Sequence, residues 1–176
     1  MDGGPSSKGW YLGMTDVRTT TETVIVLTLL SEWQYRWLVK AVCWVTGIPI
    51  PQATHCAIAI RGTVYELTNK GVGICPYSQY VKQPQLRVVD FCAIQCDTPD
   101  VWLDRIRIAA VCNARIHHRD VAKILLRRGT RGLLCTSFLQ LIMGLPLSRV
   151  PPTADQLMEQ IRQTYYKQTT QPTLNL

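Results

Sequence analysis

The chain has 176 residues, of which 47% are hydrophobic and 18% are charged. This composition excludes an intrinsically disordered protein and predicts one globular domain with its own hydrophobic core. The apolar runs are short: residues 23–30 could fill a strand but not a transmembrane helix. The N-terminus MDGGPSSKGW lacks the basic and apolar segments of a signal peptide. We therefore expect no signal peptide and no membrane span, in a protein that is cytoplasmic or associated with a virus particle.

The seven cysteines are scattered along the chain, and most of them lie within apolar segments. Their odd number and apolar surroundings predict free thiols in a reducing environment. The formal charge is +7, and residues 105–131 hold eight arginines and lysines against one acidic residue. Such a concentration favours an anionic partner: a cell-wall peptide, a phospholipid surface or nucleic acid. A solvated helix face is the alternative interpretation.

The first third of the chain predicts a flexible segment, a strand and a helix. Residues 1–20 are polar and rich in glycine, serine and threonine. The β-branched run at 23–30 predicts a buried strand. Ser31 and Gln34 have the spacing of a capping box, which predicts a helix to about residue 46.

The middle of the chain predicts a β-hairpin. Residues 55–60 and 63–68 are typical strand segments, and a two-residue turn at 61–62 separates them. The glycines and prolines of residues 69–84 predict a loop. Residues 86–94 then predict another apolar strand, so strands and helices together indicate an α+β fold with an antiparallel sheet.

Four helices are predicted after these strands. The first covers about 99–113, where Thr98 can cap the helix and a proline occupies its first turn. A basic helix at 119–128 and an apolar helix at 133–143 follow. Thr153 and the glutamine three residues later form a second capping box, which predicts a helix to about residue 166. The tail, residues 167–176, lacks a core pattern and is predicted to be disordered.

Three separated residues can form a nucleophilic site. Cys135 stands near the start of the helix predicted at 133–143, and a helix N-terminus and a nearby imidazolium both lower the pKa of a thiol. His55 opens the first hairpin strand and Glu66 lies near the end of the second. Antiparallel pairing, with partner numbers that sum to about 123, places Glu66 within diagonal reach of His55. Whether the two share a face depends on the register.

These residues have the roles of nucleophile, base and orienting carboxylate. Each has an ordinary structural alternative as well. Cys135 can be a small buried residue among leucines, His55 a strand-end histidine and Glu66 an exposed strand carboxylate.

The segment THCAIAIRGTVYELT resembles the pattern S/T-H-V-G-I-V … G … Y-V-L-E-A of circularly permuted NlpC-type papain-like cysteine peptidases. This superfamily includes the lecithin:retinol acyltransferase group and several viral and phage proteins. The order of His55, Glu66 and Cys135 is that of the permuted branch. LLCTSFLQ and residues 152–157 are also similar to the nucleophile segment and to the helix start that follows it. The resemblance covers roughly residues 20–165.

The chain departs from this pattern at several positions. Thr21 and Glu22 replace a Gly-Asp pair, and Cys56 and Ala57 replace the Val-Gly after the histidine. Ser137 replaces a glutamate. The three reactive residues are retained.

The resemblance implies a permuted papain-like catalytic domain over residues 21–166, with an antiparallel sheet packed against the nucleophile helix. It implies a cysteine hydrolase, an amidase or endopeptidase acting on peptidoglycan-like peptides through Cys135, His55 and Glu66. One alternative is a thiol acyltransferase or lipase acting on phospholipid. Another is a non-catalytic structural or virion protein that retains the fold.

A zinc site is the main alternative use of the other cysteines. Cys92 and Cys96 are suitably spaced, but His117 and His118 are adjacent, so both rarely bind one ion. Cys92 also lies within an apolar strand. We therefore expect no metal and no other cofactor.

Basic residues just before Cys135 are candidates for anion binding. Arg127, Arg128 and Arg131 can bind phosphate or steer an anionic substrate to the thiol. Aromatic residues for base stacking do not alternate with them, so a nucleic acid is the weaker alternative partner.

Overall fold

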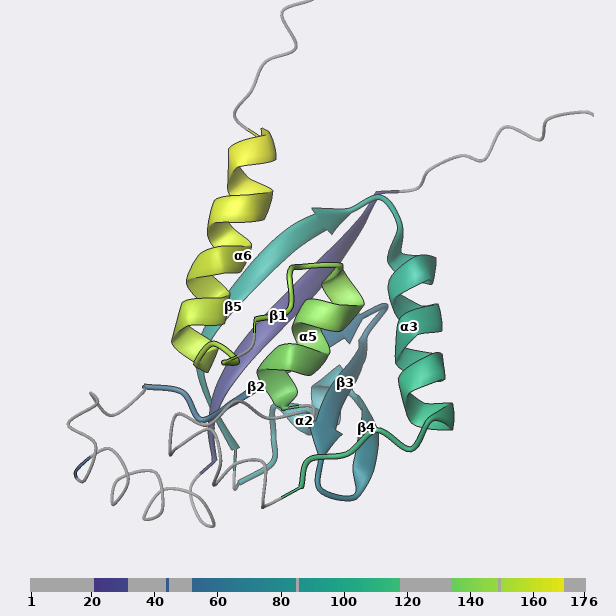
Figure 1. The fold of residues 1–176 in the computed structure, drawn as a ribbon, viewed down its shortest axis with the longest axis vertical. Coiled ribbons are helices and arrows are strands. Elements are labelled where there is room, and N and C mark those ends of the chain that lie inside the picture. The colour runs from purple at the N-terminus through teal and green to yellow at the C-terminus, as the bar shows by residue number, and fades with distance from the viewer. Residues whose placement is uncertain are drawn as a thin grey trace, which may run out of the picture.

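A computed structural model describes residues 21–31, 44, 52–84, 86–117, 134–148 and 150–169. These residues form an α+β fold with a five-stranded antiparallel sheet and four helices (Figure 1). The predicted flexible segment at 1–20, most of the helix at 31–46 and all of the basic helix at 119–128 lie outside them. None of the helices in the described part is long and apolar enough to cross a membrane.

The sheet has the strand order β4-β3-β2-β1-β5. Its strands are β1 (Glu22–Ser31), β2 (His55–Ile60), β3 (Thr63–Thr68), β4 (Gly71–Pro76) and β5 (Leu86–Cys96). The strands predicted at 23–30, 55–60, 63–68 and 86–94 are confirmed, and β5 continues two residues further. The hairpin strand β2 therefore lies in the middle of the sheet, where both of its edges are paired.

The hairpin has the predicted register. Ala57 pairs with Glu66 and Ile60 with Thr63, so the numbers of each pair sum to 123. Arg61 and Gly62 form the turn with φ angles of 51° and 72°, as two-residue hairpin turns of the I′ type require. The Arg61 guanidinium also binds the carboxylates of Glu22 at 2.7 Å and Asp100 at 2.8 Å, which joins the turn to β1 and to the helix that begins at Pro99.

The loop predicted at 69–84 is wrong in its first part. Residues there form the edge strand β4 and a short helix, α2 (Tyr77–Tyr80). Gly71 and Gly73 lower strand propensity, but every residue of β4 pairs with β3, from Thr63 with Pro76 to Thr68 with Gly71. The proline ends an edge strand, where its missing N–H costs no ladder bond. Pairing across the sheet overrides the local signal.

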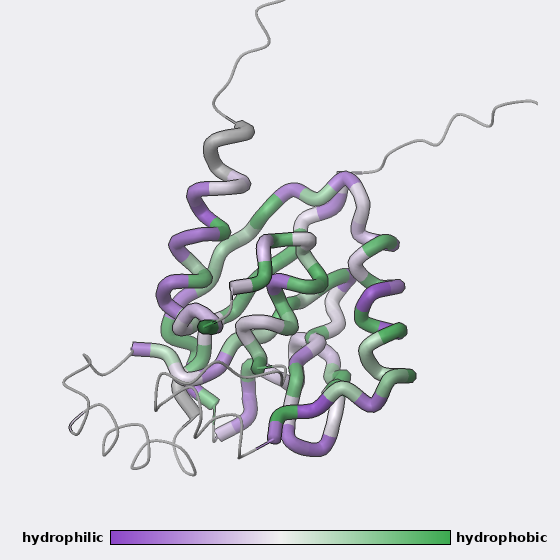
Figure 2. Tube along the Cα trace, in the orientation of Figure 1, coloured by the Kyte–Doolittle hydropathy of each residue, from purple (hydrophilic) through white to green (hydrophobic). Residues whose placement is uncertain are grey.

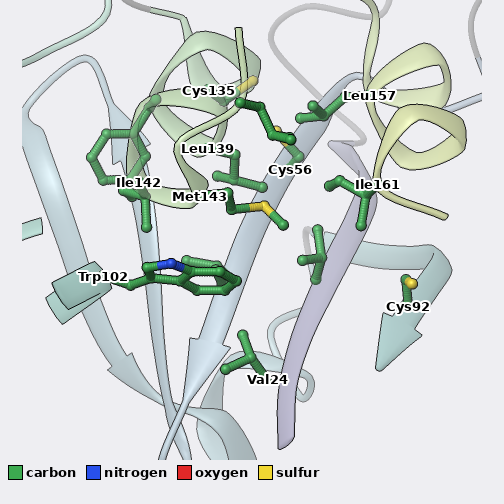
Figure 3. Packing of buried hydrophobic residues seen from close by; sticks show 14 of the residues in the cluster. Val24, Cys56, Cys92, Trp102, Cys135, Leu139, Ile142, Met143, Leu157 and Ile161 are labelled. Carbon is green, nitrogen blue, oxygen red and sulfur yellow. The ribbon is translucent and has the colours of Figure 1, made fainter. Parts of the chain in front are cut away.

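Three helices pack against one face of the sheet (Figure 1). They are α3 (Pro99–Val111), α5 (Cys135–Met143) and α6 (Ala154–Thr169). The main hydrophobic cluster lies between them and the sheet and includes Cys56, Ile58 and Ile60 of β2 together with Phe138 and Leu139 of α5 (Figure 3). Figure 2 shows hydrophilic residues on the side of α6 that faces away from the sheet.

The opposite face of the sheet carries a smaller cluster. Ala57 and Ala59 of β2 contact Leu27, Leu29 and Val64 there, and the side chain of Tyr80 in α2 completes the group. Alternate residues of β2 thus serve two cores, as expected for a central strand.

Helices α3, α5 and α6 lie where they were predicted, but their boundaries differ, and α5 begins at Cys135 and not at residue 133. α3 has Pro99 in its first turn, but Thr98 makes no side-chain capping bond and the helix ends at Val111, before residue 113. The second capping box is confirmed: the Thr153 amide donates to Gln156 Oε1 at 2.9 Å, and the Gln156 amide donates to Thr153 Oγ1 at 3.2 Å. α6 continues to Thr169, so the first three residues of the predicted tail are helical.

Candidate active site

The fold brings together the three residues that the sequence predicts for a nucleophilic site. Cys135 is the first residue of α5, and it lies near enough to His55, at the start of β2, for the histidine to lower the pKa of its thiol. His55 Nε2 lies 2.7 Å from Glu66 Oε2 on the neighbouring strand. The register explains this contact: Glu66 pairs with Ala57, two residues after His55, so both side chains are on one face.

Two anionic partners stabilise the positive charge on His55. Burial acts to lower the pKa of the imidazole, but hydrogen bonds and charge interactions with Cys135 and Glu66 raise it to about 10. Because Nε2 donates to the ionised Glu66, Nδ1 is the nitrogen left to exchange a proton with the Cys135 sulfur. Glu66 therefore fixes both the orientation of the ring and the nitrogen that faces the thiol.

A fourth side chain, which the sequence analysis missed, holds Glu66 in place. The hydroxyl of Tyr80 donates to Glu66 Oε2 at 2.6 Å, and the tyrosine is almost completely buried. Burial acts to raise the pKa of Glu66, but the bonds from His55 and Tyr80 lower it overall. Tyr80 lies within the segment that was predicted to be a loop, and no local pattern marks it; only the packing of α2 against β3 places it here.

The Cys135 thiol is strongly acidified. A hydrogen bond from the Cys56 thiol is the largest influence and lowers the pKa, burial raises it, and the bond and charge interaction with His55 lower it again. The backbone amide of Cys56 is a further donor to the sulfur. The net pKa lies well below that of an ordinary thiol, which favours a thiolate on Cys135 beside a protonated His55.

The start of α5 has backbone N–H donors near the Cys135 sulfur. Leu134 stands at the N-cap with an apolar side chain that makes no capping bond, and Phe138 is the first amide that bonds back to it, at 2.8 Å. The amides of the first turn, including that of Cys135, are therefore not capped by a side chain. Together with the positive end of the helix dipole they can stabilise an anion beside Cys135.

Glu66 lies directly over a glycine of the edge strand. Gly73 pairs with Glu66 in the β3–β4 ladder. A Cβ atom at Gly73 would come within 3.1 Å of Glu66 Cγ and 3.2 Å of its Oε1. The glycine thus provides the space for the carboxylate to reach His55, which is a role for the residue that the sequence analysis took as a loop signal.

Arg127, Arg128 and Arg131 lie outside the described residues. Cys92 and Cys96 are on the edge strand β5, and the described part of the chain contains no group of three metal-ligating side chains.

A cavity lies away from the thiol. Its volume is about 540 Å³, and it is lined by Arg105, Ile108 and Ala109 of α3 and by Leu141, Leu145 and Leu147 at and after the end of α5. Cys135 is at the other end of this nine-residue helix, about 12 Å along its axis. The cavity therefore does not contain the reactive group.

Comparisons with protein-family models, with curated proteins and with solved structures give no match to this chain. The chemistry of this chain is therefore inferred from the residues of the site itself and from their geometry.

Proposed function

We propose that this chain is a cysteine hydrolase with a permuted papain-like fold, in which Cys135 is the nucleophile, His55 the acid and base, and Glu66 the residue that orients His55. One arrangement carries the proposal: Tyr80 and His55 bond to the same oxygen of Glu66, and Cys135 lies close enough to His55 that each shifts the pKa of the other toward its charged form. A structural cysteine among leucines needs none of these partners.

The geometry supports a two-step acyl transfer. The Cys135 thiolate attacks the carbonyl carbon of an amide, and the first-turn amides of α5 hold the negative charge that develops on oxygen. The imidazolium of His55 then gives its Nδ1 proton to the leaving amine as the C–N bond breaks, which leaves a thioester on Cys135. Water resolves the thioester: His55 takes a proton from it, and Cys135 leaves as the thiolate.

Peptide amides of the peptidoglycan type are the substrate class that we propose, on the basis of the resemblance in the hairpin segment. Phospholipid is the second candidate, as the substrate of an acyltransferase or lipase. It is favoured by the cavity between α3 and the end of α5, whose lining is mainly apolar. An acyl chain that extends from a carbonyl at Cys135 along α5 would reach it.

The full-length protein can be tested with muropeptides that contain γ-D-glutamyl amide links, and separately with phosphatidylcholine vesicles. We expect new amino termini from the first substrate, no activity for Cys135→Ala, and a loss of roughly 10²–10⁴-fold for His55→Ala. For muropeptides, Cys112→Ala is the matched control, because this thiol is exposed at the end of α3 and away from Cys135. It lines the cavity proposed for an acyl chain, so it is not the control for the vesicles.

An acyl adduct on Cys135 with the vesicles, detected by intact mass, and no cleavage of muropeptides would replace the first substrate class with the second. No turnover of either substrate and no adduct would contradict the proposal, and would favour a structural protein with this fold.

A further inference from the structure

A second thiol contacts the nucleophile. Cys56 follows His55 directly in β2, and its side chain lies in the main hydrophobic cluster together with Cys135. Each thiol influences the other, since Cys135 raises the pKa of Cys56 and Cys56 lowers that of Cys135, and Figure 3 shows both side chains between β2 and the start of α5. Cys135 thus interacts with two consecutive residues of one strand, and Cys56 stands where the resembling family has valine.

The two sulfurs differ in charge and in access. Burial and the neighbouring Cys135 raise the pKa of Cys56, which stays a protonated donor while Cys135 is the thiolate. Cys56 is completely buried. Cys135 is also buried but keeps 9% of its surface exposed, so an external reagent can reach it more readily than Cys56. A cysteine sulfenic acid commonly condenses with a neighbouring thiol of this kind to form a disulfide.

We propose that Cys56 is a resolving cysteine, which converts oxidised Cys135 into a Cys56–Cys135 disulfide and so inactivates the site reversibly. The oxidant is a peroxide. The Cys135 thiolate attacks one peroxide oxygen, the O–O bond breaks, hydroxide leaves, and Cys135 becomes a sulfenic acid. The Cys56 sulfur then attacks the Cys135 sulfur, and the hydroxyl group leaves with the Cys56 proton as water. A dithiol restores both thiols by exchange.

The other buried cysteines near the core are not in this position. Cys92 pairs with Val26 of β1, which pairs in turn with Ile58 of β2. Cys92 is therefore two strands away from the strand that carries Cys56, and Cys96 is four residues further along β5. Adjacent strands are about 4.8 Å apart, so a disulfide from either residue to Cys56 would require the sheet to rearrange.

The proposal rests on the Cys135 thiolate that the proposed function also uses, but it requires no substrate. The test treats the full-length reduced protein with hydrogen peroxide, blocks free thiols, and digests it with trypsin without reduction. Cys56 lies in the tryptic peptide 41–61, which also contains Cys43, and Cys135 lies in peptide 132–149. We expect these peptides to be linked, with fragment ions that place the link at Cys56 and the same link in Cys43→Ala. Dithiothreitol should release the peptides.

Two variants separate resolution from general oxidation. In Cys56→Ala, we expect peroxide to drive Cys135 to sulfinic and sulfonic acids, so that dithiothreitol no longer restores its alkylation by iodoacetamide. Cys92→Ala, which removes another buried core thiol, should recover alkylation as the wild type does. The wild-type map tests the link even if Cys56→Ala fails to fold.

If Cys135 is alkylated rapidly in the untreated protein but peroxide produces no link to Cys56, this inference is overturned and the proposed function is left intact. Slow alkylation of Cys135 in the untreated protein would contradict the thiolate itself, and both proposals with it.

Discussion

His55 and Tyr80 donate hydrogen bonds to the same oxygen, Oε2 of Glu66, at 2.7 and 2.6 Å. The carboxylate is therefore held from β2 on one side and from α2 on the other. A single oxygen that accepts two short bonds cannot rotate away from the imidazole without breaking both of them. The direction of the His55 ring thus depends on a tyrosine that does not touch the thiol.

Replacing Tyr80 by phenylalanine tests this relationship. We expect Tyr80→Phe to lower the free energy of unfolding by about 1.5–3 kcal/mol, because it removes a hydrogen bond to a charged acceptor. The pKa of Glu66 should rise. The fall in the alkylation rate of Cys135 on acidification should therefore begin at a higher pH. Urea unfolding and the pH profile measure the two effects. Tyr77→Phe in the same helix is the control, and an equal effect there would contradict a specific role for Tyr80.

The alkylation rate of Cys135 should depend weakly on pH around neutrality. The pKa of Cys135 is lowered and that of His55 is raised to about 10, so the charged pair persists between these values. An ordinary thiol with a pKa of about 8.5 instead gains reactivity roughly tenfold per pH unit below that value. Iodoacetamide rates with peptide mapping distinguish the two profiles. A tenfold rise per unit at Cys135 would show that the pair does not form.

Glu66→Gln should change how stability depends on pH. The pKa of Glu66 is lowered below its ordinary 4.5, so its contribution to stability is present above pH 4.5 and is lost as the pH falls through the folded-state pKa. We expect the variant to be less stable than the wild type at pH 7 and the difference to shrink in acid. Urea unfolding at several pH values measures it. A difference that stays constant with pH would mean that the carboxylate charge is not what stabilises the site.

Gly73→Ala should displace Glu66 without adding a charge or removing a hydrogen-bond donor. The new methyl group would meet Glu66 at 3.1 Å, so the carboxylate must shift by a few tenths of an ångström. We expect slower alkylation of Cys135 at neutral pH, with a smaller effect on unfolding. Ile74→Ala, at an exposed position of the same edge strand, is the comparison. Unchanged alkylation in Gly73→Ala would show that Glu66 has room to move.

Gly144→Ala should destabilise the C-terminal end of α5. Gly144 has a φ of 72°, and a Cβ there would lie 3.0 Å from the Arg105 Nη1 atom that donates to the carbonyl of Ile142 at 2.8 Å. We expect a loss of about 1–2 kcal/mol from the left-handed backbone alone. Gly144→Asn should cost less, since asparagine tolerates this conformation. Equal unfolding midpoints for all three proteins would contradict the backbone argument.

The parts of the site that local chemistry determines could be predicted from the sequence. The two-residue turn at Arg61 and Gly62 allows one pairing of β2 with β3, and that register places Glu66 beside His55. The Thr153 capping box is likewise a contact between residues three apart. The start of a helix close to Cys135 could be predicted because Gly132, just before it, interrupts the preceding helical pattern.

The rest depends on contacts between distant segments. Gly73 lies in a segment whose composition indicates a loop, and only pairing with β3 makes it a strand residue. Tyr80 acquires its role from the position of α2, and Cys56 from the packing of α5 against β2. None of these three residues carries a local signal for the partner that it meets.

The hairpin that unites His55 and Glu66 closes a short stretch of chain, whereas Cys135 must close a loop of about eighty residues to join them. Hairpins form in microseconds, and contacts of such long range form later. The imidazole and carboxylate can therefore meet on a nascent chain well before the sulfur arrives. Until that last docking step, Cys135 lacks the neighbours that lower the pKa of its thiol. Rapid alkylation of this one among the seven cysteines would therefore indicate that folding is complete.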